Sequence, residues 1–155
     1  MTDYAIEIDR LPRYNEKVTI TTEAISYNKI FCYRNFYITD ETGQQIMLFK
    51  TTFALMDYET RKVAEVPDEV VAPYEADKTK KLLRGPRYKA LENPIETLYR
   101  VRYFDLDMNG HVNNSKYLEW MLDVFDLDFL TKYTPAHIDL KYVKEFIMGQ
   151  GLFRL

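Results

Sequence analysis

The sequence predicts an α+β fold in which antiparallel strands accompany a central helix, and three observations lead to this prediction. The first 60 residues alternate apolar and polar side chains with a period of two, which is typical of half-buried strands. Residues 66–94 contain four prolines, which interrupt regular structure. Residues 113–125 carry apolar side chains at helical spacing. We therefore expect a strand-rich unit over residues 1–66, a linker over 67–94 and a second unit over 95–155.

The first unit is expected to be a meander of four strands. Tyr4, Ile6 and Ile8 alternate with more polar residues, so their side chains should share one face. The same period continues over residues 18–24, and residues 31–38 are aromatic and β-branched. A turn at Asp40–Gly43 precedes a fourth strand over residues 45–56. One face of this sheet should pack on a core while the other meets solvent or a partner.

The second unit is expected to hold one helix between strands. Residues 96–104 alternate as a strand, and residues 105–114 form a polar loop that contains Gly110. Asn113 is a favourable N-cap for the helix over residues 113–125. Further strands should begin at Ile138 and at Leu152, and a short helix is expected at the centre of the linker.

The composition excludes several classes of protein. A net charge of −3 and a pI near 5.5 argue against a general nucleic-acid binder. The single cysteine, Cys32, permits no internal disulfide and is expected to be a buried structural thiol in a reducing compartment. No signal peptide begins the sequence, and no apolar run approaches the ~20 residues that would cross a membrane. We therefore expect a soluble cytoplasmic protein with no membrane span.

Polar side chains that could perform chemistry gather in the loop before the helix. Asp107, Asn109 and His111 occur within five residues, between an expected strand and an expected helix. Loops held by rigid elements are where catalytic groups tend to lie. The N-terminus of the helix also supplies backbone N–H groups and a partial positive charge, which could stabilise the oxyanion of an acyl-transfer reaction.

This segment, from Tyr103 to Trp120, resembles the signature of the hot-dog-fold thioesterases: an Asp-x-Asp loop, a Gly-His-Val-Asn-Asn turn and a helical Tyr-Leu. Within that superfamily, Asp107, Asn109 and His111 match the Asp-x-Asn-x-His pattern of the acyl-acyl-carrier-protein (acyl-ACP) thioesterases. The family has a further acid on the strand after the helix, and Glu145 takes that position here. A cysteine commonly follows this acid in the plant members; Phe146 stands there in this sequence, so no thiol mechanism carries over.

The resemblance implies hydrolysis of a fatty acyl thioester on acyl carrier protein, with no metal or organic cofactor. Glu145 would be the general base for water, and Asn109 would polarise the acyl carbonyl or position the water. Asp107 and His111 would orient Asn109. An acyl-coenzyme A thioesterase of the same fold and a non-catalytic acyl-binding fragment are the alternatives.

Three further residues are candidates for substrate binding, and each has a structural alternative. Asn113 could contact the substrate or could simply cap the helix. Tyr117 and Trp120 could form part of the wall of an acyl pocket, or they could belong to the core. Asp105 is expected only to accept hydrogen bonds from the loop backbone.

The resemblance also implies a tandem hot-dog fold, two units in which a curved antiparallel sheet wraps a central helix. In this family the first unit mainly shapes the acyl pocket and the second holds the catalytic residues. This chain is apparently truncated at both ends, because the first unit lacks an opening strand and helix and the second lacks its closing strands. The alternative is one composite hot-dog in which both halves share the helix over residues 113–125.

Two surfaces are expected to bind other proteins. The linker is strongly basic, and acyl carrier protein is acidic, so the carrier is expected to dock there; the alternative is a solvated linker face. The cations concerned are Lys78, Lys80, Lys81, Arg84 and Arg87. A half-covered sheet would also expose apolar surface and strand edges, which favours a homodimer or aggregation.

Overall fold

The computed structural model describes residues 1–60, 62–83, 85, 89, 92, 96–142 and 153–154. The chain divides into two compact units, which we describe separately. Unit 1 comprises residues 1–86 together with 134–142, and unit 2 comprises residues 87–133 together with 143–155. An α+β architecture follows, because unit 1 is dominated by a sheet and unit 2 contains the longer helices.

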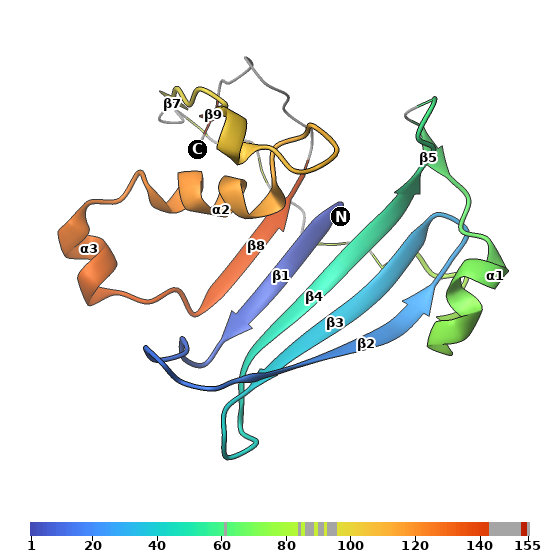
Figure 1. Ribbon diagram of the computed structural model, residues 1–155, viewed down its shortest axis with the longest axis horizontal. Helices are drawn as coiled ribbons and strands as arrows, with labels where there is room; N and C mark the ends of the chain where they lie inside the picture. The colour runs from blue at the N-terminus through green and yellow to red at the C-terminus, as the bar shows by residue number, and fades with distance from the viewer. Residues whose placement is uncertain are drawn as a thin grey trace. The chain divides into compact units, whose positions relative to one another are not determined.

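Unit 1 is a mixed sheet whose described strands run in the order β6-β2-β3-β4-β1-β8, with β5 paired to β4 (Figure 1). All pairs are antiparallel except β2 with β6. The alternation in the first 60 residues therefore correctly predicted four strands. The strands are β1 (Asp3–Ile8), β2 (Thr19–Tyr27), β3 (Phe31–Thr39), β4 (Gln45–Met56), β5 (Val63–Ala64), β6 (Asp77–Lys78) and β8 (His137–Lys141).

The turn between β3 and β4 forms where the sequence predicted it. The Asp40 carboxylate accepts hydrogen bonds from the backbone N–H groups of Thr42 and Gln44, at 2.9 and 3.0 Å. Gly43 has a φ of 83°, a left-handed conformation that glycine adopts without strain. The turn residues thus direct the chain from β3 back into β4.

The register gives the sheet two chemically distinct faces, because directly paired residues of antiparallel strands point to the same side. Ile6 pairs with both Phe49 and Ile138, and Phe49 pairs with Phe36. The face containing them, here called the apolar face, carries Tyr4, Ile6, Ile8, Ile20, Phe36, Ile38, Met47, Phe49, Ile138 and Leu140. The opposite polar face carries Asp3, Glu7, Glu23, Asn35, Tyr37, Lys50, His137, Asp139 and Lys141.

Strand β8 is the main departure from the expected units. The sequence placed this segment with residues 95–155, whereas the structure pairs β8 with β1, from Asp3 opposite Lys141 to Glu7 opposite His137. A strand joins the sheet whose edge it can hydrogen-bond, and this partner is more than 130 residues away. Local periodicity therefore identified the strand but not its neighbour.

The beginning of the predicted linker is attached to unit 1. Helix α1 (Asp68–Val71) continues into the 3-10 turn η1 (Ala72–Tyr74), so the short helix lies near the start of the linker rather than at its centre. Val71 and Val66 pack with Tyr27 in a small buried cluster. The Asp68 carboxylate accepts hydrogen bonds from the Tyr27 hydroxyl at 3.2 Å and from Lys78 Nζ at 2.7 Å.

Cys32 is half-buried and lies beside this cluster, on β3. Burial raises the pKa of its thiol above the ordinary value, and the nearby charge of Arg34 lowers it less. A thiol that stays protonated is a poor nucleophile, which is consistent with the structural role predicted for Cys32.

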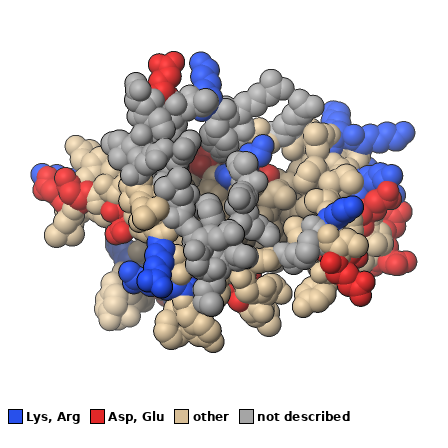
Figure 2. Space-filling view, turned by 90° about the horizontal axis from the view of Figure 1, so that it is seen from above, with Lys and Arg blue, Asp and Glu red and all other residues tan. Residues whose placement is uncertain are grey.

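Charges of both signs are interspersed on the molecular surface. Figure 2 shows Lys and Arg side chains beside Asp and Glu on the face that it draws. Several are exposed ion pairs, including Lys50 with Glu7 and Lys78 with Asp68. Such pairs typically contribute about 0–1 kcal/mol to the free energy of unfolding, so they add little to the stability of the fold.

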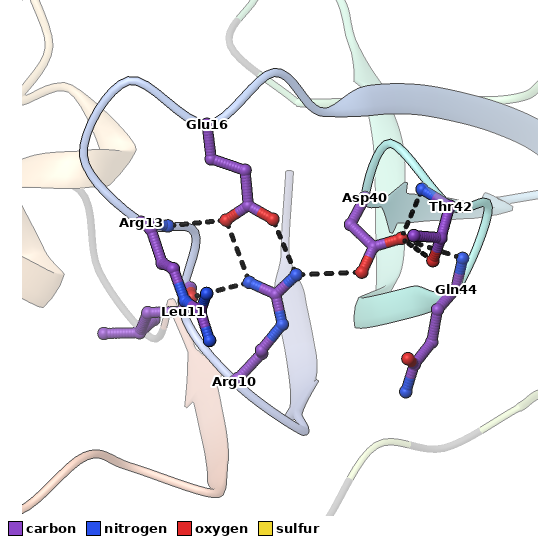
Figure 3. A network of polar contacts seen from close by, with 7 residues as sticks. All are labelled: Arg10, Leu11, Arg13, Glu16, Asp40, Thr42 and Gln44. Carbon is purple, nitrogen blue, oxygen red and sulfur yellow. Dashed lines mark hydrogen bonds and ion pairs between the residues drawn. The ribbon is translucent and has the colours of Figure 1, made fainter.

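An ionic network that is better shielded from solvent lies at one end of the sheet. Arg10, just after β1, donates to both carboxylate oxygens of Glu16 at 2.9 and 2.6 Å and to Asp40 at 2.9 Å (Figure 3). The Arg13 backbone N–H also donates to Glu16, at 2.6 Å. The carboxylate side chains of Glu16 and Asp40 are only 14% and 11% exposed. The network thereby ties the loop before β2 to the turn between β3 and β4.

This network predicts a loss of stability in acid. The hydrogen bond from Arg10 lowers the pKa of Glu16 from 4.5 to about 2. Hydrogen bonds from Thr42 and then Arg10 lower the pKa of Asp40 from 3.8 to about 2, although burial opposes them. A lowered folded-state pKa means that the stabilisation is complete above the ordinary pKa values and is lost as the pH falls towards about 2.

We therefore expect the melting temperature of the wild-type protein to fall more steeply between pH 4.5 and pH 2 than that of Arg10→Gln. Arg13→Gln is the matched control, because it removes a neighbouring cation while keeping the backbone donor to Glu16. Thermal unfolding followed by circular dichroism at several pH values measures the difference. Parallel pH profiles for wild type and Arg10→Gln would contradict this account.

Unit 2 contains α2 (Asn114–Leu122) and α3 (Leu127–Lys132), preceded by the 3-10 turn η2 (Tyr103–Asp105). Strands β7 (Glu96–Thr97) and β9 (Phe153–Arg154) pair antiparallel. The expected strand over residues 96–104 was wrong beyond Thr97, because the Asp105 carboxylate accepts from Arg102 N–H at 2.7 Å and closes a turn there. The expected helix over residues 113–125 ends at Leu122, and Asp126 caps a second helix by accepting from Phe129 N–H at 2.7 Å.

Within the residues that the structure describes, no helix is both long enough and apolar enough to span a membrane.

Candidate active site

The candidate catalytic loop lies between η2 and α2 and is closed by backbone hydrogen bonds. Asp107 N–H donates to the His111 carbonyl at 2.7 Å, and Asn113 N–H donates to the Asp105 carbonyl at 2.7 Å. Between them, Leu106 and Val112 form an isolated β-bridge, and Val112 is buried. These bonds make the loop a small hairpin whose ends cannot separate without breaking the hydrogen-bond ladder.

The tip of the hairpin is a tight turn. Gly110 N–H donates to the Asp107 carbonyl at 3.0 Å, which spans three residues. Gly110 has a φ of 78°, and residues with a side chain rarely adopt this left-handed conformation. The turn places Asn109 and His111 on either side of a glycine and close to Asp107.

The Asp107 carboxylate organises this turn. One of its oxygens accepts from Asn109 N–H at 2.8 Å and from His111 N–H at 3.2 Å. Burial raises the pKa of Asp107, but the hydrogen bonds from His111 and Asn109 and the charge of His111 outweigh it, so the net pKa lies below the ordinary value. Asp107 is therefore a carboxylate rather than a carboxylic acid at neutral pH.

Three of the four predicted catalytic residues are thus brought together. Asp107 and His111 are half-buried, and Asn109 is exposed at the tip of the turn. Glu145 lies outside the described residues. The arrangement presents a carboxylate, an amide and an imidazole in one turn, which are groups suited to orienting water and a carbonyl group.

Asn113 acts as the N-cap of α2. Its side-chain oxygen accepts from the Ser115 N–H and from the Ser115 hydroxyl, both at 3.0 Å. The Asn113 carbonyl accepts from Lys116 N–H at 2.9 Å. The structural alternative that the sequence offered for Asn113 is therefore realised, and its contact with a substrate stays a prediction.

Tyr117 and Trp120 are core residues of unit 2, with 6% and 9% exposure. The Trp120 ring stacks on Tyr99 with a centroid distance of 5.5 Å and packs against Tyr117 at 5.7 Å. The Tyr99 hydroxyl donates to the Trp120 carbonyl at 3.1 Å. Sequence reasoning did not single out Tyr99, which is half-buried, because a contact between Tyr99 and the helix more than 20 residues later leaves no local pattern.

The described residues contain no group of three or more His, Cys, Asp or Glu side chains that could hold a metal ion.

Comparison with protein families gives two successive matches, separated by residues 75–87. Residues 1–74 match the model of the acyl-ACP thioesterase N-terminal domain, and residues 88–153 match the model of the acyl-ACP thioesterase C-terminal domain. The second match contains the whole hairpin and α2. Together the two models cover nearly all of the chain.

Curated relatives agree with these matches. The acyl-[acyl-carrier-protein] hydrolase FATB3 of Cuphea viscosissima is 26% identical over 153 residues, which is 94% of this chain and 37% of that protein. The oleoyl-acyl carrier protein thioesterase 2 of Arabidopsis thaliana is 28% identical over 156 residues, covering 90% of this chain and 42% of that protein. The chain therefore spans well under half the length of these curated relatives.

Solved structures extend the likeness to the fold. A Lactobacillus plantarum protein assigned as an oleoyl thioesterase is 38% identical and superimposes with a TM-score of 0.89, over 97% of this chain and 60% of that one. An acyl-ACP thioesterase from Bacteroides thetaiotaomicron is 28% identical with a TM-score of 0.81, over 96% of this chain and 60% of that one.

The hot-dog fold that the sequence predicted is confirmed by these superpositions, in which the chain covers 60% of each solved relative. The hairpin of Asp107, Asn109 and His111 lies within the matched C-terminal domain. On the two family matches and the solved relatives together, the chain belongs to the acyl-ACP thioesterase family.

Proposed function

We propose that this chain hydrolyses fatty acyl-ACP thioesters to a free fatty acid and carrier protein. The observation that supports this most is the Asp107 carboxylate, which accepts the backbone N–H groups of Asn109 and His111 and so holds both residues in one turn. Several relatives are named as acyl-ACP hydrolases or thioesterases, which describes the same reaction.

The proposed reaction assigns one role to each side chain. Water attacks the thioester carbonyl carbon, and Glu145, as general base, takes a proton from that water. Asn109 polarises the carbonyl or positions the water, while the Asp107 carboxylate and His111 orient Asn109. The tetrahedral oxyanion then collapses, the C–S bond breaks, and the thiolate of the carrier accepts a proton.

A groove on unit 1 supports docking of the acidic carrier protein. It encloses about 710 Å³, with Ile30, Phe31 and Leu82 as apolar lining and Lys29, Lys78 and Lys80 as basic lining. Lys78 and Lys29 form exposed ion pairs with Asp68 and Glu65, whereas Lys80 has no ion-pair partner among the described residues. Lys81 is also exposed, and Arg84 and Arg87 lie outside the described residues.

The groove combines two features that suit an acidic amphipathic partner. Basic side chains attract the partner over a distance of about one Debye length, roughly 8 Å at physiological salt. Apolar lining residues then provide burial once the partner has arrived. We therefore assign the predicted basic surface to this groove.

The place of action within the cell stays a prediction. The sequence predicted a cytoplasmic protein, and the names of the plant relatives describe those proteins as chloroplastic.

The proposed activity is tested by measuring free-thiol release from matched acyl-ACP and acyl-coenzyme A substrates. We expect faster release from acyl-ACP, and a loss of roughly 100-fold or more in kcat/KM for Asn109→Ala and for His111→Ala. Gln45→Ala, an exposed amide on β4, is the matched control and should keep full activity. Equal or better use of coenzyme A substrates would favour the alternative thioesterase.

The carrier-binding groove is tested with the same assay. Lys80→Glu should raise KM for acyl-ACP several-fold without changing kcat/KM for acyl-coenzyme A, because only the carrier contacts the groove. Lys62→Glu makes the same charge change elsewhere on unit 1 and should alter neither. Acyl binding with no turnover in a folded wild-type protein would instead favour the non-catalytic alternative.

A further inference from the structure

The basic side of the carrier-binding groove comes from a segment that has little regular structure. This segment, residues 77–83, is called the basic segment here and contains Lys78, Lys80 and Lys81. The structure describes all seven residues, of which β6 takes only the first two, where it pairs with the end of β2. Beyond Lys78 the backbone therefore needs other partners if its cations are to keep fixed positions.

Asn28, in the turn between β2 and β3, is the first of these partners. Its side-chain oxygen accepts from Ile30 N–H at 2.9 Å and from Phe31 N–H at 2.8 Å, which closes the turn. Its amide nitrogen donates to the Lys81 carbonyl at 3.3 Å. One side chain thus shapes the wall of the groove and holds the backbone of the basic segment beside that wall.

Tyr33, on β3, is the second partner. Its hydroxyl accepts from Leu83 N–H at 3.1 Å and from the amide nitrogen of Asn28 at 3.2 Å. Tyr33 pairs with Ser26 of β2 and with Thr52 of β4, so its backbone is fixed from both sides. Because the residue is only 7% exposed, its hydroxyl is a rigid anchor for the basic segment.

These contacts fix the basic segment on both sides of two exposed cations. Pairing with β2 fixes its start, where Thr79 N–H also donates to the Tyr27 carbonyl at 2.8 Å. The hydroxyl of Tyr33 fixes its end. Lys80 and Lys81 lie between the two fixed points, and both are exposed. Their positive charges are therefore carried by a backbone that is already ordered.

We propose that Tyr33, through its hydroxyl, positions the basic segment for the acidic carrier protein. This role rests on the proposed function and adds to it a residue that need not touch the carrier. Binding costs conformational entropy for each group that it has to order, so a surface that is ordered in advance binds more tightly. A buried hydroxyl on β3 thus sets the affinity for the carrier without taking part in thioester hydrolysis.

Tyr33→Phe tests this role, because it keeps the ring in the core and removes only the hydroxyl. Leu83 N–H then loses its acceptor, so the end of the basic segment should detach from the sheet. Tyr37→Phe is the matched control on the same strand. The Tyr37 hydroxyl also makes two hydrogen bonds, with Asn35 at 3.0 Å and Glu23 at 2.7 Å, and neither involves the basic segment.

Hydrogen exchange measures the attachment of the basic segment without any carrier. In Tyr33→Phe we expect the amide of Leu83 and its neighbours in the segment to exchange at least about tenfold faster than in wild type. In Tyr37→Phe they should exchange at the wild-type rate, and circular dichroism should show that both variants are folded. Unchanged exchange in Tyr33→Phe would overturn the proposal, independently of any activity.

Binding of acyl carrier protein without an acyl chain, followed by fluorescence anisotropy, measures the effect on affinity. We expect Kd to rise about three- to tenfold in Tyr33→Phe and to stay unchanged in Tyr37→Phe. In the hydrolysis assay, KM for acyl-ACP should rise by the same factor, while kcat and the kcat/KM for acyl-coenzyme A keep their wild-type values. A fall in kcat with no change in Kd would overturn the positioning role.

A double-mutant cycle shows whether Tyr33 acts through the basic segment. Lys80→Glu should weaken carrier binding less in the Tyr33→Phe background than in wild type, because Lys80 is then no longer held in place. Additive effects would contradict the proposal, and a wild type that does not bind the carrier would overturn it together with the carrier-binding groove. Carrier binding with the expected pattern but no turnover would support the role of Tyr33 and refute the proposed hydrolysis.

Discussion

Asp107→Asn is expected to abolish most of the thioester hydrolysis while leaving the protein folded. The amide keeps an oxygen that can accept from Asn109 N–H and His111 N–H, so the turn should persist. The negative charge of the carboxylate is lost, however, and with it the electrostatic part of its proposed role in orienting Asn109. We expect kcat/KM to fall by about 10²- to 10⁴-fold, the range typical of removing a group that acts in proton transfer or its orientation.

Asp107→Ala shows how much of the effect comes from the carboxylate's charge and how much from its hydrogen bonds to Asn109 N–H and His111 N–H. It removes both hydrogen bonds of the turn, so activity should fall at least as far as in Asp107→Asn and the hairpin amides should exchange faster with solvent. Free-thiol release and hydrogen exchange measure the two effects.

Asp105→Asn is the matched control in the same loop. The Asp105 carboxylate accepts a hydrogen bond from Arg102 N–H, and asparagine can still accept there. Its activity should stay within a few-fold of wild type. Equal losses in Asp105→Asn and Asp107→Asn would mean that Asp107 supports the loop and has no particular role in the reaction.

Trp120→Ala is expected to cause the largest loss of stability in unit 2. The ring is 9% exposed and packs between Tyr99 and Tyr117, so its removal leaves a cavity beneath α2. Truncation of a buried tryptophan typically lowers the free energy of unfolding by about 3–5 kcal/mol. Chemical denaturation followed by far-ultraviolet circular dichroism measures the change.

Two milder substitutions show whether stacking carries this effect. Trp120→Phe keeps an aromatic ring against Tyr99 and should cost less than the alanine variant. Tyr99→Phe keeps the stack but removes the hydroxyl that donates to the Trp120 carbonyl, which should cost about 1 kcal/mol. A fully stable Trp120→Ala protein with weakened acyl binding would instead make Trp120 a wall of the acyl pocket.

Several features were predictable from the sequence because they depend on neighbouring residues. Alternation over a few residues identified β1 and its buried side chains Tyr4, Ile6 and Ile8, since the strand period is two. Asn113 was predictable as an N-cap because a cap needs only an acceptor just before a helical stripe. The catalytic roles of Asp107, Asn109 and His111, which the Asp-x-Asn-x-His motif suggested, stay predictions.

Local patterns misled where a nearby polar group competed with the expected element. Residues 96–104 alternate as a strand would, yet the Asp105 carboxylate accepts a hydrogen bond from the Arg102 N–H, and the backbone forms a turn there. Such side-chain hydrogen bonds offer the backbone an alternative to a strand ladder. The same holds after Leu122, where Asp126 starts a separate helix.

By itself, then, the sequence determined the first four strands, the turn at Gly43 and the cap of α2, all within short stretches of chain. Only the tertiary structure decided that β8 pairs with β1 and that Arg10 joins Glu16 to Asp40. The two strands β1 and β8 pair residues more than 130 positions apart. The register of such a pair depends on the packing of whole faces rather than on local propensity.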